Sequence, residues 1–191
     1  MCRVVQIMGI KMMETIEYCD VTHIKPMGEG LRVCIDFVDA LAPTEGVFVG
    51  DTGYGYLLSL SESVPTTTYP ARPFRVNAGA FHQYLLLEEG KTCYLSELKA
   101  GDKIPVYSRE GMRVISVGRV KIERRELLQV QCTCGNQVLS STVQFSDSVR
   151  FFGKENMVDA KTVEVGDKLV CRHDIPGRHL GKRKEEYIEE I

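Results

Sequence analysis

The stretch Tyr69–His82, which reads YPARPFRVNAGAFH, is the part of the sequence that most directly indicates the fold. Pro70 and Pro73 fix their own φ angles and push the residues before them toward extended geometry. Residues 71–76 are therefore predicted to run straight as a strand. The stretch also holds two arginines, an asparagine and a histidine, so we expect it to contribute to a binding or catalytic site.

Alternation along this strand predicts which side chains lie on its polar face and which point into a core. Arg75 and Asn77 are expected on one face, whereas Phe74 and Val76 point the other way into a core. Residues 77–80, Asn-Ala-Gly-Ala, are predicted to form a low-profile turn that lets a ligand approach the backbone closely. The simpler alternative is that the arginines are solvated charges at a strand edge and that the small residues are merely a turn.

Short extended segments recur along the rest of the chain, separated by Gly, Pro, Asp or Ser. They are rich in β-branched and aromatic residues, a pattern typical of strands. We predict a mostly β protein, built as one or more small barrel-like or sandwich domains, with one N-terminal helix over residues 1–17. The predicted strands include Leu31–Val38, Gly55–Leu60, Tyr84–Leu87, Ile104–Tyr107 and Leu127–Cys132.

An internal repeat supports the barrel-like prediction. Leu98–Val106 aligns with Val163–Cys171, 65 residues further on, and both copies read Leu/Val-x-x-Gly-Asp-Lys before an apolar run. Two copies of a turn followed by a strand are typical of a small β domain with a pseudo-repeat.

Two further turns are expected from local sequence. Gly28 and Gly30 are predicted to make a turn between two strands. Arg124 and Arg125 are predicted to turn a hairpin, because residues 118–123 and 128–134 both alternate between apolar and polar side chains.

Composition restricts the kinds of function. The chain has 191 residues, 43% apolar content and a formal net charge of -2, which argues against binding nucleic acid through phosphate neutralisation. No apolar stretch is long enough to span a membrane, and no signal peptide is apparent. The odd count of seven cysteines then indicates free thiols. We expect a soluble, intracellular protein, with the cytoplasm favoured and a plastid left open.

Two other polar segments have residues suited to anion or metal binding. The loop Gly50–Gly55 offers backbone N–H groups, but it leads into an apolar strand, so a β-turn is the better interpretation. Cys132 and Cys134 share one face of a predicted strand, but no second ligand pair stands at metal-binding spacing. Core packing is the favoured role of both thiols, and no metal site is expected.

These motifs together resemble the archaeal-type 3-dehydroquinate synthase family, also called dehydroquinate synthase II, in its C-terminal portion. The resemblance covers roughly residues 20–181. It rests on RPFRVNAG at Arg72–Gly79, GKTCYLSELKAGD at Gly90–Asp102, VGRVKIERR at Val117–Arg125 and GRHLG at Gly177–Gly181. Without the resemblance, Gly177–Gly181 reads equally well as an exposed basic tail.

The resemblance implies an enzyme of the shikimate route to aromatic amino acids. Such enzymes use NAD+ to deaminate 2-amino-3,7-dideoxy-D-threo-hept-6-ulosonate oxidatively and then close the carbon chain to 3-dehydroquinate. A carboxylate clamp and proton-transfer groups are needed for that chemistry. The implied catalytic residues are His82, His179 and Glu62, and the implied substrate-binding or cofactor-binding residues are Arg72, Arg75, Asn77 and Arg178.

The domain expectation follows from the same resemblance. Residues 1–19 are expected to be a remnant of a preceding N-terminal region, residues 20–181 the β region with a sub-boundary near residue 90, and residues 182–191 a charged tail. A truncated or partial enzyme of this kind is expected to need an N-terminal-half partner or a homo-oligomer. The sequence departs from the family at Gln144–Ser148, QFSDS, where Gln-Asn-Ala-Glu-Thr is expected. A non-catalytic β module that binds an anionic metabolite or a partner protein is the alternative.

Overall fold

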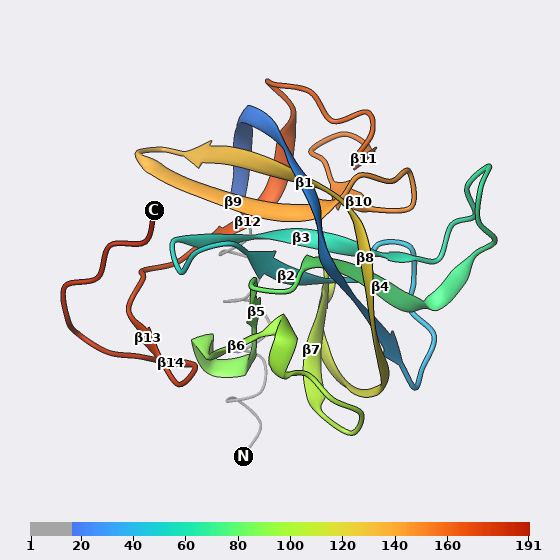
Figure 1. The fold of residues 1–191 in the computed structure, drawn as a ribbon, viewed down its shortest axis with the longest axis horizontal. Coiled ribbons are helices and arrows are strands. Elements are labelled where there is room, and N and C mark those ends of the chain that lie inside the picture. The colour runs from blue at the N-terminus through green and yellow to red at the C-terminus, as the bar shows by residue number, and fades with distance from the viewer. Residues whose placement is uncertain (1–16) are drawn as a thin grey trace, which may run out of the picture.

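The computed structural model describes residues 17–191, apart from the side chains of Arg178 and His179. This part of the chain holds fourteen strands and two short 3₁₀ helices, so the prediction of a mostly β protein is confirmed (Figure 1). The helix predicted over residues 1–17 lies outside the described residues except for Glu17, which begins a strand. No helix within residues 17–191 is long and apolar enough to cross a membrane.

Two unusually long strands organise the sheet. Strand β1 (Glu17–Phe37) and strand β8 (Gly111–Cys134) pair antiparallel along most of their lengths, and Figure 1 shows them running together across the molecule. In β1 the residues Cys19, Val21 and Arg32–Phe37 toward the two ends are buried, whereas residues 25–31 in the middle are largely exposed. The two strands therefore link two separate packed regions.

The remaining elements pair with these strands or with one another in a 12-stranded sheet, and a separate two-stranded ribbon lies near the C-terminus. The same sheet includes strands on both sides of residue 90. The other elements are β2 (Gly46–Gly50), β3 (Gly55–Glu62), β4 (Arg72–Ala80), β5 (Tyr84–Leu86), η1 (Glu88–Gly90), β6 (Thr92–Tyr94), η2 (Leu95–Glu97), β7 (Lys103–Ser108), β9 (Gln137–Gln144), β10 (Arg150–Phe152), β11 (Met157–Asp159), β12 (Lys168–His173), β13 (Arg178–His179) and β14 (Lys182–Arg183).

Two of the predicted turns are wrong, because β1 and β8 each continue through them. Gly28 has a φ of 75° and lies beside a register shift in β1, so it forms a bulge rather than a hairpin. Arg124 and Arg125 lie within β8, opposite Leu31 and Gly30. Tight hairpins favour residues that adopt positive φ easily, which arginine does not, and β1 offers these residues a continuous ladder instead.

The central stretch also differs from its prediction beyond residue 76. Residues 77–80 remain within β4 rather than turning, and the register against β1 shifts between Val33 and Cys34. Val76 is buried as expected, but Phe74 is exposed, so its predicted place in the core is wrong. Arg75, on the face expected to be polar, is buried because a charged partner lies beside it on β1.

Apolar side chains gather in separate cores around the two halves of the long ladder. One core joins the first half of β1 to the second half of β8 and includes Val130, Phe151 and Leu169. Another joins the second half of β1 to the first half of β8 and includes Ile35 and Ile104. Burial of these alternating faces explains why both strands stay extended over so many residues.

The two Gly-Asp-Lys segments make turns with matching backbone hydrogen bonds. The N–H of Gly101 donates to Val117 O at 2.8 Å, and the N–H of Gly166 donates to Val21 O at 2.8 Å. Both glycines have positive φ, 92° and 100°. Each turn leads directly into a buried strand, β7 or β12.

Candidate active site

A buried carboxylate and a partly exposed imidazole form the most distinctive polar site. Asp51 follows β2, and its Oδ1 lies 3.1 Å from Nε2 of His82. The carboxylate also accepts hydrogen bonds from Ser140 Oγ at 2.7 Å, from the Thr142 N–H at 3.1 Å and from Gln129 Nε2 at 3.1 Å. The Asp51 side chain is 7% exposed and the His82 side chain 58% exposed, so a fixed anion lies beneath a reachable ring.

The open edge of β9 explains why these side chains gather. Strand β9 pairs with β8 along one edge, and at Thr142 the N–H donates to side chains, those of Asp51 and Gln83, instead of to another strand. Gln83 also donates to the Thr142 carbonyl at 2.9 Å. Because a buried backbone group needs a partner, these two side chains stabilise the edge and hold His82 beside it.

The hydrogen bonds of the pair shift both pKa values in the direction that favours the charged forms. The hydrogen bond to Asp51 raises the pKa of His82 and outweighs the opposite effect of partial burial. Burial acting by itself would raise the pKa of Asp51, but hydrogen bonds from His82, Ser140 and Thr142 lower it instead. Asp51 is therefore a carboxylate that accepts from Nε2–H, which leaves Nδ1 of His82 available for proton transfer.

Asn77, on β4, also contacts β9. Its Nδ2 donates to Oε1 of Gln144 at 2.9 Å. Asn77 contacts Gln144, and Asp51 contacts Ser140 and Thr142. Residues 140, 142 and 144 alternate along β9 and share one face, so Asn77 and Asp51 lie at the same part of that strand. Oδ1 of Asn77 and Oγ1 of Thr142 are buried and have no hydrogen-bond partner among the described residues.

The close approach of β4 to β9 requires glycine at position 79. Gly79 has a φ of 96°, and a Cβ atom there would lie 2.3 Å from Thr142 O and 2.5 Å from Gln83 Nε2. Both the backbone conformation and the available space exclude a side chain. This glycine therefore brings β4, which carries Asn77, against the edge that holds the Asp51 pair.

The predicted anion-binding arginine Arg75 already holds a carboxylate. Its Nε and Nη2 donate to the two oxygens of Asp36 at 2.7 and 3.0 Å, and Nη2 of Arg119 lies 2.6 Å from Oδ2 of Asp36. Burial opposes ionisation of Asp36, but the two guanidinium groups outweigh it and lower the pKa of that carboxyl. The three side chains form a charged layer between β1, β4 and β8.

Two other predicted residues form a second ion pair on β3 and β4. Nε of Arg72 lies 2.6 Å from Oε2 of Glu62, and the Arg72 guanidinium stacks 4.6 Å from the ring centre of Tyr69. The Glu62 side chain is nearly fully buried, whereas Arg72 keeps partial exposure.

The segment that contains Arg178 and His179 lies elsewhere. Strand β13 pairs with β14 as a ribbon, and the Gly181 carbonyl accepts a hydrogen bond from the Thr92 N–H at 2.8 Å. This contact places the ribbon beside β6, near the lower left of Figure 1.

The structure thus brings some predicted residues together and separates others. Asn77 contacts β9 directly through Gln144, and His82 is linked to β9 through Asp51. Glu62 pairs with Arg72, whereas Arg75 pairs with Asp36. Sequence reasoning missed Asp51, whose donors Ser140 and Thr142 lie about ninety residues away along the chain. The available signal was an aspartate within a glycine-rich loop.

The glycine-rich loop does not fit the phosphates of NAD. It connects β2 to β3 without opening a helix, which confirms the β-turn interpretation. The Gly53 N–H donates to Oε2 of Glu190 at 2.7 Å, and the adjacent Asp51 carries a negative charge that would repel phosphate.

Fold and site together define a β domain in which a buried carboxylate orients an accessible imidazole at a strand edge. Residues 18–191 match the model of a protein family described as the 3-dehydroquinate synthase II C-terminal domain. The chain belongs to this family, as the sequence motifs predicted.

Archaeal proteins named 3-dehydroquinate synthase are similar over most of the chain. The protein of Methanococcus maripaludis strain C5 is 40% identical over 177 residues, which cover 92% of this chain and 49% of that protein. The protein of Methanosarcina barkeri is 38% identical over 177 residues, with 92% and 46% covered, and that of Methanospirillum hungatei is 39% identical over 191 residues, with 99% and 58% covered. The chain therefore spans about half the length of these curated relatives. No solved structure matches it.

Proposed function

We propose that this chain takes part in the synthesis of 3-dehydroquinate from 2-amino-3,7-dideoxy-D-threo-hept-6-ulosonate, as the C-terminal region of an NAD-dependent 3-dehydroquinate synthase. The observation that carries the proposal is the Asp51–His82 pair, in a chain whose relatives are named for this activity. Ring closure by an aldol reaction needs a group that removes and returns protons, and the accessible imidazole suits that role.

In the proposed closure, Nδ1 of His82 takes a proton from the carbon next to the substrate carbonyl. The carbon–carbon bond then forms, and the carbonyl oxygen that is attacked receives a proton. Asp51 accepts from Nε2–H throughout, so it fixes the ring orientation and stabilises the protonated imidazole. His82 is therefore the proposed catalytic residue and Asp51 its positioning residue.

Arg72 is the better of the two β4 arginines for the substrate carboxylate. Among the described residues its ion pair with Glu62 uses Nε, which leaves the terminal nitrogens for a ligand, whereas Arg75 holds Asp36 through Nε and Nη2. We assign Glu62 the role of orienting Arg72, and Arg75 the role of holding the strands together. Arg178 and His179 remain proposed contributors, on the ribbon that contacts β6.

NAD+ is proposed to make its phosphate contacts outside this chain. The Gly50–Gly55 loop does not suit phosphate, and the relatives are about twice as long as the matched region. When bound, NAD+ would supply the oxidation of the amine-bearing carbon. A partner segment equivalent to the other half of the relatives is therefore part of the proposal.

The test uses the purified 191-residue chain, the amino-heptulosonate substrate and NAD+, with and without the N-terminal half of the Methanococcus maripaludis relative. NADH and 3-dehydroquinate are both measured. We expect both products only when the N-terminal half is added, and a mixture containing His82→Gln should form little 3-dehydroquinate. If neither product forms although the two halves associate, the alternative of a non-catalytic β module that binds an anionic metabolite or a partner is favoured.

A further inference from the structure

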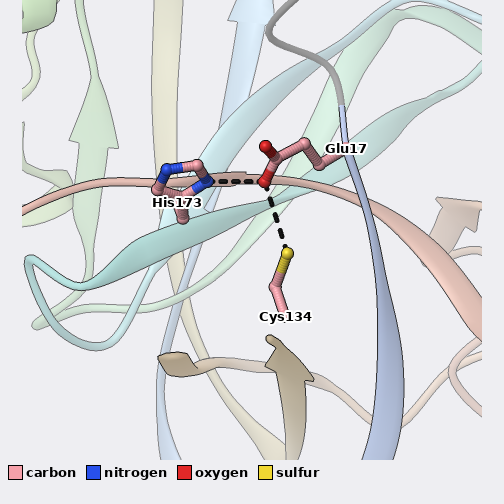
Figure 2. Close-up of side chains that lie close together, drawn as sticks. All are labelled: Glu17, Cys134 and His173. Carbon is pink, nitrogen blue, oxygen red and sulfur yellow. Dashed lines mark hydrogen bonds and ion pairs between the residues drawn. The ribbon is translucent and has the colours of Figure 1, made fainter. Parts of the chain in front are cut away.

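Three side chains capable of binding a metal ion converge at the far end of the long ladder. Nδ1 of His173 lies 2.5 Å from Oε2 of Glu17, and Sγ of Cys134 lies 3.3 Å from the same oxygen. All three ligand atoms lie within 4.8 Å of one another. Figure 2 shows the Glu17 carboxylate between the imidazole and the thiol, with each side chain contributed by a different strand.

Strand order explains this convergence. Strand β1 lies between β12 and β8 in the sheet, and Glu17 on β1 is directly opposite Cys171 on β12. Because side chains two residues apart share a face, Cys171 and His173 are on one side of the same strand, as are Cys132 and Cys134 on β8. Register alone therefore brings these groups to one face of three neighbouring strands.

The donor set matches the ligands of a zinc-class ion. Thiolate, imidazole and carboxylate are the three side-chain types that zinc takes in proteins. Ligand atoms in a tetrahedral zinc site lie roughly 3–4 Å apart, given metal–ligand bonds of about 2.0–2.3 Å. The three atoms here can reach that spacing through small side-chain adjustments.

The surroundings suit such a site as well. The side chains of His173 and Glu17 are 54% and 39% exposed, so an ion can enter from solvent. Behind them lies a layer of buried thiols in one apolar core, Cys19, Cys132 and Cys171, and Cys134 packs against that core. This packing holds β8 and β12 in place against β1, which positions the ligands in advance of binding.

We propose that Glu17, Cys134 and His173 bind one divalent transition-metal ion of the zinc class. Three protein ligands leave one coordination position open for water, as in zinc sites that are not purely structural. Bound metal would also join β1, β8 and β12 at one point and stabilise the folded chain. The proposal is independent of the 3-dehydroquinate synthase assignment.

Cobalt provides the first test, because a thiolate bound to Co²⁺ gives a charge-transfer band in the near ultraviolet. The reduced, metal-free 191-residue chain is titrated with Co²⁺ in the absence of substrate. We expect one Co²⁺ per chain with this band, its loss in Cys134→Ser and its retention in Cys93→Ser, which alters a thiol on β6. Absence of the band in the unaltered chain, or its persistence in Cys134→Ser, would overturn the proposal.

A second variant avoids dependence on a partly buried cysteine. His173 is exposed, so His173→Gln should fold normally, and His23→Gln is its matched control on the exposed part of β1. Zinc affinity, measured by competition with a chromophoric chelator, should fall more than about tenfold in His173→Gln and remain unchanged in His23→Gln. Equal affinities in the two variants would contradict the assignment of His173.

Discussion

Nε2 of His82 lies 3.1 Å from Oδ1 of Asp51, although the two residues belong to different loops, one after β4 and the other after β2. The pair combines a carboxylate that water scarcely reaches with an imidazole that a substrate can reach. Such an arrangement fixes both the tautomer and the orientation of the ring.

Replacing Asp51 with asparagine should lower the pKa of His82 toward its ordinary value of 6.5, because the hydrogen bond to Asp51 is the main cause of the increase. The shift is measured by following the imidazole signals of His82 by NMR across a pH titration. Asp39→Asn is the control, since Asp39 is exposed and pairs with Arg113 instead. An unaltered His82 titration in Asp51→Asn would show that the pair does not exist in solution.

The same pair should make stability depend on pH in a defined direction. Because the folded-state pKa of His82 is raised, its contribution is fully present below about pH 6.5 and is lost as the pH rises through the raised value. Urea unfolding of the unaltered chain and of His82→Gln across this range gives the comparison. The stability difference between the two should shrink with rising pH, and a difference that grows would contradict the assignment.

Asp36→Asn should destabilise the fold by about 3–5 kcal/mol, because it leaves the buried charge of Arg75 without its partner. Arg119→Ala is the matched variant, because it removes the other guanidinium group that pairs with the Asp36 carboxylate. The Arg119 side chain is 63% exposed, so its removal should cost less than about 1 kcal/mol. Urea unfolding measures both values, and equal losses would show that burial does not distinguish the two arginines.

Asp36 should also contribute to acid unfolding. Its pKa is lowered in the folded state, so its stabilising effect is present above its ordinary value of 3.8 and is lost as the pH falls through the lowered value. The unfolding free energy of the unaltered chain should therefore fall more steeply than that of Asp36→Asn between about pH 5 and pH 2. Parallel curves for the two chains would be the contrary result.

Gly79→Ala should be clearly more destabilising than Gly28→Ala. Both glycines have positive φ, which costs an alanine about 1–2 kcal/mol. A Cβ atom at position 79 would also overlap Thr142 O, whereas nothing lies within 4 Å of one at position 28. Thermal unfolding of the two variants gives the comparison, and similar midpoints would mean that β4 does not approach β9 so closely.

Local sequence signals were sufficient for the class of fold and for several elements. Short β-branched runs predicted the strands, and the Gly-Asp-Lys segments predicted turns before β7 and β12. These features depend on residues that are close together in the chain.

Features that depend on distant partners were not predictable in this way. The supposed turn at Arg124 and Arg125 is extended because β1, about ninety residues earlier, provides a complete ladder. Cys134 was predicted to pack in the core, since the sequence around it shows no histidine at ligand spacing. His173 and Glu17 reach it through strand pairing, at separations of 39 and 117 residues along the chain.

The most direct test of the account is the rate of 3-dehydroquinate formation when the chain is combined with the N-terminal half of an archaeal relative. The unaltered chain, His82→Gln and the control His23→Gln are compared under identical conditions. We predict that His82→Gln lowers the rate by about 10²–10⁴-fold, as expected for loss of a general acid–base group, and that His23→Gln leaves it unchanged. Equal rates for all three chains would contradict the assignment of His82 as the catalytic residue.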